Sequence, residues 1–226
     1  IFGVERICIS HVSHSDHSAG LPAFLGIRNS SRGDKEKGVS IYYPADDFAM
    51  LDYREFIDKR YKNWLTFPIS WNPIMPGHKI PLDFNHHIES FKLHHTKKST
   101  TLGYKIVESR SRLKSEFRGQ DIPALIKSGV SKDLLNEPYD AITLAYCLDA
   151  YRLDIADIAN AELAIMDCSF LKEGEREDLT HFELKEAIAV AKEAKVKHFI
   201  GAHVSSRYYA QDIVDAQKAL NENFGS

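Results

Sequence analysis

Three histidines and one aspartate lie within seven consecutive residues near the start of this chain, at His11, His14, Asp16 and His17. They follow an apolar segment at residues 7–9, which predicts a buried strand, and they precede a turn into a helix. A strand that ends in such a cluster delivers metal-ligating side chains to the rim of a sheet, where an ion can keep an open coordination position. The sequence therefore predicts a metal site at the end of the first strand.

The cluster resembles the HxHxDH motif of the metallo-β-lactamase superfamily. In that motif the first two histidines bind one zinc ion, and the aspartate and the last histidine bind a second. This chain reads H-x-x-H-x-D-H instead, because Ser13 adds one residue. Either Ser13 bulges out and His11 still reaches the metal, which we favour, or the first zinc site is weakened.

Other candidate ligands follow other predicted strands. His95 follows the segment 88–93, Asp149 follows 141–147, and His203 follows 198–202. Together with the first cluster they complete a predicted two-metal site. One ion takes His11, His14 and His95, the other takes Asp16, His17 and His203, and Asp149 lies between them. Such a carboxylate bridge holds two ions about 3.5–4 Å apart, an arrangement that activates water for attack on phosphorus.

Strands and helices are predicted in both halves of the chain, which favours an α/β or layered α+β fold. The expected strands are residues 6–10, 39–43, 88–93, 102–108, 141–147, 163–167 and 198–202. The expected helices are residues 17–27, 46–60, 180–194 and 210–221. We treat residues 1–226 as one domain.

Residues 109–138 are predicted to form an insertion between two strands. The insertion begins with polar and basic residues, contains a short predicted helix at 122–127, and then becomes polar again. Its cations are Arg110, Arg112, Lys114 and Arg118. This pattern fits either a protruding basic arm or a solvated linker helix.

The composition limits the classes of function. The net charge of −3 over 226 residues does not indicate nucleic-acid binding by the whole surface, so any RNA contact requires a local basic patch. No apolar run approaches the roughly 20 residues that a membrane helix needs. The three cysteines lack metal-binding or disulfide spacing, which favours buried thiols and a reducing cytoplasm.

Several segments, taken together and in order, resemble the tRNase Z family, short form. The segments are SHVSHSDHSAGLPAFLGIRN, GDKEKGVSIYYP, LHHTKKSTTLGY, AELAIMDCSFL, THFELKEA and KHFIGAHVSSRY, with RSRLKSEFRGQDIPALIKSGV resembling the family's basic arm. The chain has Asp167 where the family has Glu, and Leu148 where the family has the Gly before Asp149. The family also has strands before and after these segments, so we expect that the termini of this chain are incomplete.

The resemblance implies a four-layer αββα metallo-β-lactamase sandwich, in which the N-terminal strands are expected to be missing. It implies metal-dependent removal of the 3′ trailer from precursor tRNA in the cytoplasm by a homodimer with two Zn²⁺ per chain, or Mn²⁺ in their place. Asp16 would orient the attacking hydroxide, and His181 would donate a proton, steered by Asp167. The cations expected to bind RNA are Arg28, Arg110, Arg112, Lys114, Arg118 and Arg207.

Two alternatives remain at this point. A phosphodiesterase for a small diester or cyclic nucleotide would keep the metals but would not need a basic arm. A degenerate homologue that only binds RNA would explain Ser13 and Leu148, but the retention of all seven candidate ligands opposes it.

Overall fold

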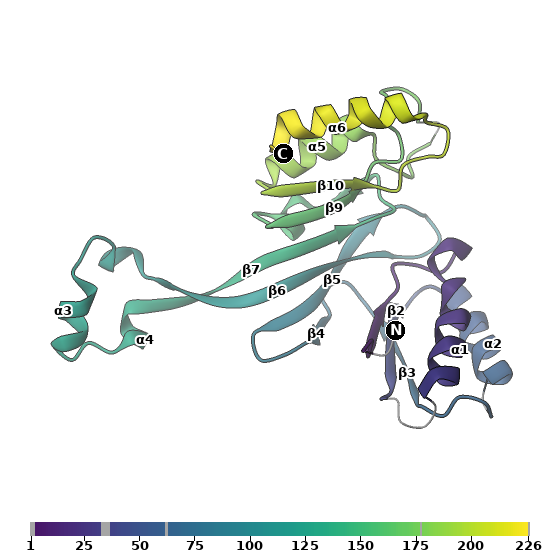
Figure 1. The fold of residues 1–226 in the computed structure, drawn as a ribbon, viewed down its shortest axis with the longest axis horizontal. Coiled ribbons are helices and arrows are strands. Elements are labelled where there is room, and N and C mark those ends of the chain that lie inside the picture. The colour runs from purple at the N-terminus through teal and green to yellow at the C-terminus, as the bar shows by residue number, and fades with distance from the viewer. Residues whose placement is uncertain (1–2, 33–36, 62, 177, 226) are drawn as a thin grey trace.

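The computed structural model describes residues 3–32, 37–61, 63–176 and 178–225. Two sheets lie face to face, with a pair of helices covering the outer side of each, and a long hairpin projects from one of them (Figure 1). This is the predicted four-layer αββα arrangement. Residues 33–36, which begin the segment GDKEKGVSIYYP, lie outside the described residues.

The smaller sheet is parallel and has the order β1-β2-β3. Its strands are β1 (Arg6–Cys8), β2 (Val39–Pro44) and β3 (Ile69–Ile74), and its helices are α1 (Gly20–Arg32) and α2 (Ala49–Tyr61). Leu25, Ile41, Met50 and Ile57 are almost fully buried between this sheet and its helices.

The larger sheet has the order β10-β9-β7-β6-β5-β4, and β8 also pairs with β5. Its strands are β4 (Lys79–Pro81), β5 (His86–His94), β6 (Thr101–Leu113), β7 (Asn136–Cys147), β8 (Arg152–Leu153), β9 (Leu163–Asp167) and β10 (His198–Ala202). Helices α5 (Leu184–Glu193) and α6 (Ala210–Phe224) cover its outer face. Strands β7, β9 and β10 are parallel, so their carboxyl ends meet at one edge.

The inner faces of the two sheets share a third apolar cluster. Ile74, Ile80, Leu102 and Tyr104 are buried there. The Tyr104 hydroxyl donates a hydrogen bond to the carbonyl of Ile9 at 2.7 Å, and the backbone N–H of Leu102 donates to the carbonyl of Ser10 at 2.9 Å. These bonds fix the end of β1, and therefore the histidine cluster that follows it, against the larger sheet.

The insertion is an extension of the sheet with a small helical tip. Strands β6 and β7 continue outward in register from Ser109 opposite Asp140 to Leu113 opposite Asn136. Helices α3 (Ile122–Lys127) and α4 (Lys132–Leu135) form the tip, far from the body of the molecule (Figure 1). The helix at 122–127 agrees with the prediction, whereas the strands extend further than predicted.

Other boundaries also differ. The predicted helix at 180–194 begins only at Leu184, because Glu183 and Glu186 cap the helix reciprocally. The predicted helix at 17–27 begins at Gly20, after a short 3-10 turn at Ser15–His17. Strands β3, β4 and β8 were not predicted, because they are short or contain proline. Within the described ranges, no helix has the length and apolar character that crossing a membrane requires.

Candidate metal centre

The seven predicted ligands meet where the carboxyl ends of strands from both sheets converge. Four of them follow β1, and one each follows β5, β7 and β10, namely His95, Asp149 and His203. The parallel alignment of β7, β9 and β10 brings the last of these side chains to the same edge. Residues far apart in sequence are thereby collected into one place.

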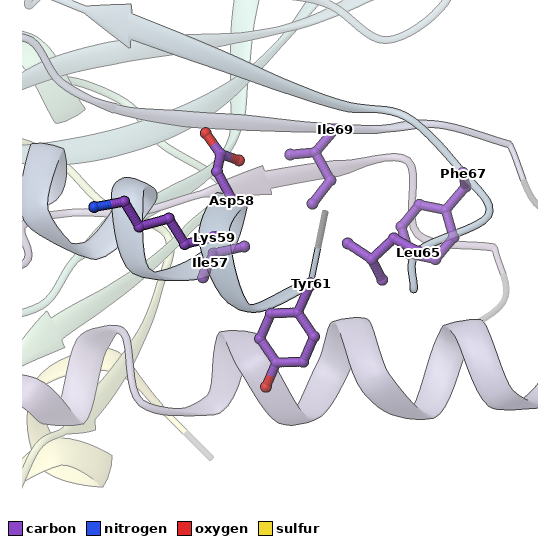
Figure 2. A pocket seen from close by; sticks show the side chains of 7 residues that line it. All are labelled: Ile57, Asp58, Lys59, Tyr61, Leu65, Phe67 and Ile69. Carbon is purple, nitrogen blue, oxygen red and sulfur yellow. The ribbon is translucent and has the colours of Figure 1, made fainter. Parts of the chain in front are cut away.

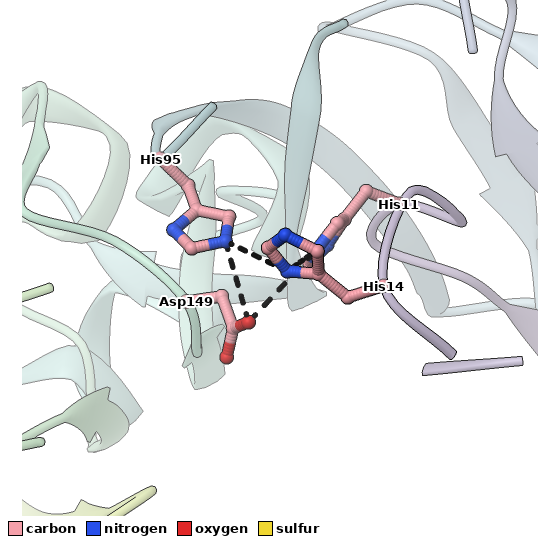
Figure 3. Close-up of side chains that lie close together, drawn as sticks. All are labelled: His11, His14, His95 and Asp149. Carbon is pink, nitrogen blue, oxygen red and sulfur yellow. Dashed lines mark hydrogen bonds and ion pairs between the residues drawn. The ribbon is translucent and has the colours of Figure 1, made fainter. Parts of the chain in front are cut away.

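The first ligand group consists of His11, His14, His95 and Asp149, whose ligand atoms all lie within 4.8 Å of one another. Their side chains point toward a common centre (Figure 3). Nδ1 of His14 lies 3.3 Å from Nε2 of His11 and 3.4 Å from Nε2 of His95. Oδ2 of Asp149 lies 3.6 Å from Nε2 of His95 and 3.8 Å from Nε2 of His11.

The position of His11 bears on the effect of the inserted Ser13. His11 has no exposed surface and lies inside the first group, whereas Ser13 is exposed. The extra residue is therefore accommodated on the outside of the turn. This geometry favours the bulge over a weakened first site.

The second ligand group consists of Asp16, His17 and His203, again within 4.8 Å of one another. Asp149 connects it to the first group, because Oδ2 of Asp149 lies 2.8 Å from Nε2 of His17 while its Oδ1 lies 3.2 Å from Nε2 of His203. Asp149 thus lies between the groups, as the two-metal arrangement requires.

Two buried polar atoms in this cluster fit a bound cation. Nε2 of His17 and Oδ1 of Asp149 are inaccessible to solvent and make no hydrogen bond within the described part of the chain. A buried polar atom without a partner costs free energy. Both atoms have free lone pairs when the imidazole is neutral and carries its proton on Nδ1, beside the Ser10 hydroxyl, and imidazole nitrogen and carboxylate oxygen are ligands that Zn²⁺ accepts. The residues therefore fit a metal site.

Backbone and hydroxyl groups outside the cluster orient its histidines. Nδ1 of His95 lies 2.8 Å from the carbonyl of Thr180, to which it donates, leaving Nε2 directed at the centre. The Ser10 hydroxyl lies 3.1 Å from Nδ1 of both His11 and His17. Such contacts set the ring orientation of metal-binding histidines. The sequence analysis missed Thr180, which only the fold brings to His95, and Ser10, which precedes His11 in the sequence but meets His17 through the turn.

His181 and Asp167 form a pair beside the second group. Nδ1 of His181 lies 2.6 Å from Oδ2 of Asp167, whose side chain is fully buried. The Ser169 hydroxyl and the N–H of Ala150 also donate to Asp167, at 2.7 and 3.1 Å. The His181 ring stacks on that of His203 with centroids 5.0 Å apart. His181, Asp167, His203 and Asp149 also lie close enough to share an ion.

Burial and neighbouring charges shift the protonation of this cluster. Burial lowers the pKa of His11 to about 3, so its ring is neutral and able to ligate. Burial raises the pKa of Asp149, but the close contact and charge of His17, with the charges of His203 and His95, outweigh it and hold that pKa below its usual range. Burial lowers the pKa of His181, but the hydrogen bond and charge of Asp167 outweigh it and raise that pKa.

Two residues of the site have left-handed backbone conformations. The φ angles of Asp149 and His203 are 57° and 62°. Aspartate and histidine adopt this region more readily than most residues, and such strain is concentrated at functional sites. Leu148 is not among the described residues with positive φ, so the glycine that the family has there is not needed to make this turn.

The predicted RNA-binding cations have different environments. Lys114 and Arg118 lie on the arm, and Arg207 is exposed, with its guanidinium 5.1 Å from the centre of the Phe170 ring. The paired residues 109–113 and 136–140 form the stalk of the arm, and Arg110 and Arg112 lie on it. Both are ion-paired, Arg110 to Glu108 and Glu162, and Arg112 to Glu137.

The prediction for Arg28 is wrong. Its side chain is fully buried, donates to the carbonyls of Val4 and Lys37, and lies against the Phe67 ring. A side chain in this environment cannot reach a phosphate, so Arg28 stabilises the fold.

A cavity of about 570 Å³ adjoins the second group and opens beside Asp16, His17 and His203. Its far wall is apolar and contains Tyr104 and Tyr146. A second cavity, of about 430 Å³, lies between α2 and the segment 65–69, where Figure 2 shows its largely apolar lining. None of the seven ligands lines the second cavity, whereas the first adjoins three of them.

Comparison with known proteins agrees with this fold. The structure is similar to the metallo-β-lactamase fold protein YhfI from Bacillus subtilis, with a TM-score of 0.63, 17% identity, and coverage of 98% of this chain and 72% of that one. It is also similar to Zn²⁺-bound PqqB from Methylobacterium extorquens, with a TM-score of 0.57, 13% identity, and coverage of 96% and 69%. No protein-family model matches the chain.

Sequence comparison gives relatives along nearly the whole chain. Ribonuclease Z from Listeria welshimeri is 29% identical over 96% of this chain and 74% of its own length. Ribonuclease Z from Bacillus subtilis is 25% identical over 98% and 76%, and ribonuclease Z from Haloferax volcanii is 25% identical over 92% and 71%.

The fold, the ligand groups and these relatives define a metal-dependent hydrolase of the metallo-β-lactamase fold. Within this class, the chain resembles ribonuclease Z, also called tRNase Z, over almost its whole length, which confirms the resemblance stated from its motifs.

Proposed function

We propose that this protein is an endoribonuclease that removes the 3′ trailer from precursor tRNA and leaves a 3′-hydroxyl. The observation that carries this proposal is the convergence of seven metal-type ligands at one edge of a fold that also bears a long projecting arm. Its similarity to ribonuclease Z selects the substrate class. We further propose that it acts in the cytoplasm as a homodimer.

The two ligand groups would hold two Zn²⁺ ions, with Asp149 shared between them. Zinc is preferred because imidazole nitrogens dominate the donor set, and Mn²⁺ is the second choice. When bound, such ions lower the pKa of water and offset the charge that develops on a phosphate.

The remaining chemistry belongs to His181, Asp167 and Asp16. Asp167 holds the His181 ring and favours its protonated form. His181 would donate that proton to the leaving 3′ oxygen as the bond from phosphorus to this oxygen breaks. Asp16, whose carboxylate is largely exposed beside the cavity, would orient the attacking water.

Phosphate contacts would position the RNA. Lys114 and Arg118 on the arm, and Arg207 beside the centre, are the predicted cations that remain available for this role. Arg110 and Arg112 face carboxylates, so we assign them to the stiffness of the arm. Phosphate contacts of this kind supply much of the affinity for RNA and make it dependent on salt.

The test is cleavage of a 3′-extended tRNA transcript by purified protein whose metal content has been measured. We expect two ions per chain and a single new 3′-hydroxyl end close to the acceptor stem. Cyclic nucleotides and bis(p-nitrophenyl) phosphate are assayed in parallel. Efficient turnover of a cyclic nucleotide without transcript cleavage would establish the small-diester alternative, and a chain without bound metal or activity would establish the degenerate one.

A further inference from the structure

Four cations surround the loop that joins β5 to β6, directly after the candidate ligand His95. Lys92, Lys97, Lys98 and Arg152 are all exposed. The three lysines line a cavity of about 240 Å³. Arg152 reaches the same place from β8, where it is paired with His94 in the sheet and its Nη2 lies 3.4 Å from the His94 ring. We call these four residues the β5–β6 patch.

The charges of the β5–β6 patch are not neutralised by the protein. Across the described ranges, none of its four side chains forms an ion pair with a carboxylate. Many other cations of this chain do, for example Lys105 with Glu89 and Arg176 with Glu186. A cluster of unpaired cations repels itself, so it is an unfavourable arrangement unless an anion binds there.

The carboxylate that lines the same cavity is used inside the fold. Asp46 accepts hydrogen bonds from the backbone N–H of Thr100 at 3.1 Å and from its hydroxyl at 2.8 Å. The Thr96 hydroxyl donates to the carbonyl of Ser99 at 3.2 Å. These bonds hold the loop in one shape and direct Asp46 at the backbone. The lysines are therefore presented to solvent on a fixed loop.

The orientation of β5 places the patch on the outside of the metal centre. Along this strand Leu93 is buried in the core, so Lys92 and His94 on either side of it point to the opposite face. The next residue, His95, faces the ligand group. A polymeric substrate with one phosphate at the centre would bring its neighbouring phosphates past this loop.

We propose that the β5–β6 patch is a second RNA-contact surface, which binds the phosphodiester backbone next to the scissile phosphate and is separate from the arm. This inference rests on the proposed function. It follows from charge complementarity, because a chain with a net charge of −3 attracts RNA through local basic patches and not through its whole surface. The patch carries no sequence information, so it positions the strand rather than selecting it.

The test compares two double variants that remove the same charge. Lys97→Gln/Lys98→Gln alters the patch, and Lys192→Gln/Lys218→Gln alters exposed lysines on the outer helices α5 and α6. In single-turnover titrations with a 3′-extended tRNA transcript, we expect the patch variant to raise the half-saturating concentration roughly tenfold. The slope of log affinity against log salt should decrease by roughly 0.7–0.9 for each lost contact. The plateau rate, the turnover of bis(p-nitrophenyl) phosphate and the behaviour of the control should not change.

Other outcomes would overturn the inference. Equal affinities and salt slopes in the two double variants would show that RNA does not touch the patch. An equal loss of bis(p-nitrophenyl) phosphate turnover would show that the loop acts by supporting His95. If the wild-type protein does not cleave the transcript, the proposed function fails, and fluorescence anisotropy of the same transcript still tests the patch. Weaker binding by the patch variant alone would then support it, whereas equal binding, or none by any protein, would refute it.

Discussion

The His181 ring is held by a carboxylate at one nitrogen and by the neighbouring rings of His95 and His203. Asp167 accepts a hydrogen bond from Nδ1 and raises the pKa of the ring, which also stacks on the ring of the candidate ligand His203. A ring held in this way stays protonated to a higher pH than a free histidine. This is the property that a proton donor needs at neutral pH.

Replacing His181 by alanine should lower the rate of transcript cleavage by about 10²–10⁴-fold, the usual contribution of a positioned acid. The metal content should stay constant, as measured by elemental analysis. In the wild-type protein the rate should fall as pH rises through the raised pKa of His181, because the acid is then deprotonated. The rate of the variant should not show this decrease at high pH. Exposed His198, replaced by alanine, is the control. Loss of metal from the His181 variant would instead make this residue a ligand.

For single residues, the sequence predicted which side chains form the site, but it did not predict what surrounds them. Spacing alone placed the ligand candidates at strand ends, and the fold brings them together. It could not show that Ser13 turns outward, because a bulge depends on the contacts of its neighbours. It also could not show that Arg28 is buried, because the carbonyls that accept its hydrogen bonds come from distant segments.

A network of ion pairs, which we call the bracket, attaches the start of the arm to the body. Arg110 on β6 contacts Glu162, which precedes β9, at 2.7 Å, and Glu108 at 2.6 Å. Lys197, next to β10, lies 3.5 Å from the same Glu162. The bracket therefore ties the start of the arm to the two strands that lie on the far side of β7.

Arg110→Met should loosen this attachment and leave the centre intact. We expect kcat/KM for a 3′-extended transcript to decrease by at most roughly fivefold, since ion pairs close to solvent are weak. Turnover of bis(p-nitrophenyl) phosphate should be unchanged, because this substrate does not reach the arm. Arg112→Met, which removes one exposed pair further out, should have a smaller effect. An equal effect of the two variants would mean that charge on the stalk matters rather than the bracket.

The arm also shows what the sequence could not predict among the elements. Residues 109–113 and 136–140 are polar and lack the apolar alternation that identifies a strand, so they resemble a loop. Their pairing is stabilised by contacts across the hairpin, such as Arg112 with Glu137 and Ser109 with Asp140. Such contacts become apparent only when the register is known. The amphipathic helices and apolar strands of the body were predictable because their burial patterns are local.

For the molecule as a whole, the ligand groups join the two halves of the sandwich. Residues that follow β1 belong to the smaller sheet, while His95, Asp149 and His203 belong to the larger one. An ion that binds this set binds only the folded arrangement of both halves. Bound metal therefore stabilises the entire sandwich by mass action.

Removing the metal with a chelator should lower the melting temperature. An ion present at 100 times its dissociation constant stabilises the fold by about 2.7 kcal/mol. For a chain of this size that corresponds to a shift of roughly 5–10 °C. Differential scanning calorimetry with and without added Zn²⁺ measures the shift, and His14→Ala, which removes a largely exposed ligand, should reduce it. A melting temperature insensitive to zinc in the wild-type protein would contradict metal binding between the halves.

The reactivity of the three cysteine thiols measures how readily the folded protein opens. Burial raises the pKa of Cys8 to about 11, and it raises the pKa of Cys147 and Cys168 further. Because the thiolate is the reactive form, iodoacetamide should label the native protein very slowly at pH 8, with Cys8 first. Labelling should accelerate above pH 10 at Cys8, and all three should react at once in denaturant. Mass spectrometry of the labelled sites checks this order, and rapid native labelling of Cys147 would show that the core opens locally.

The distribution of ligands along the chain also has a consequence during protein synthesis. A nascent chain carries the ligands from the segment after β1 early, but it lacks His203 until β10 has left the ribosome. The second ligand group therefore cannot be completed by a half-made chain, and hydrolytic activity cannot precede the assembly of both sheets. A product truncated before β10 would keep the first group and remain without nuclease activity, which would protect cellular RNA from unfinished copies of the enzyme.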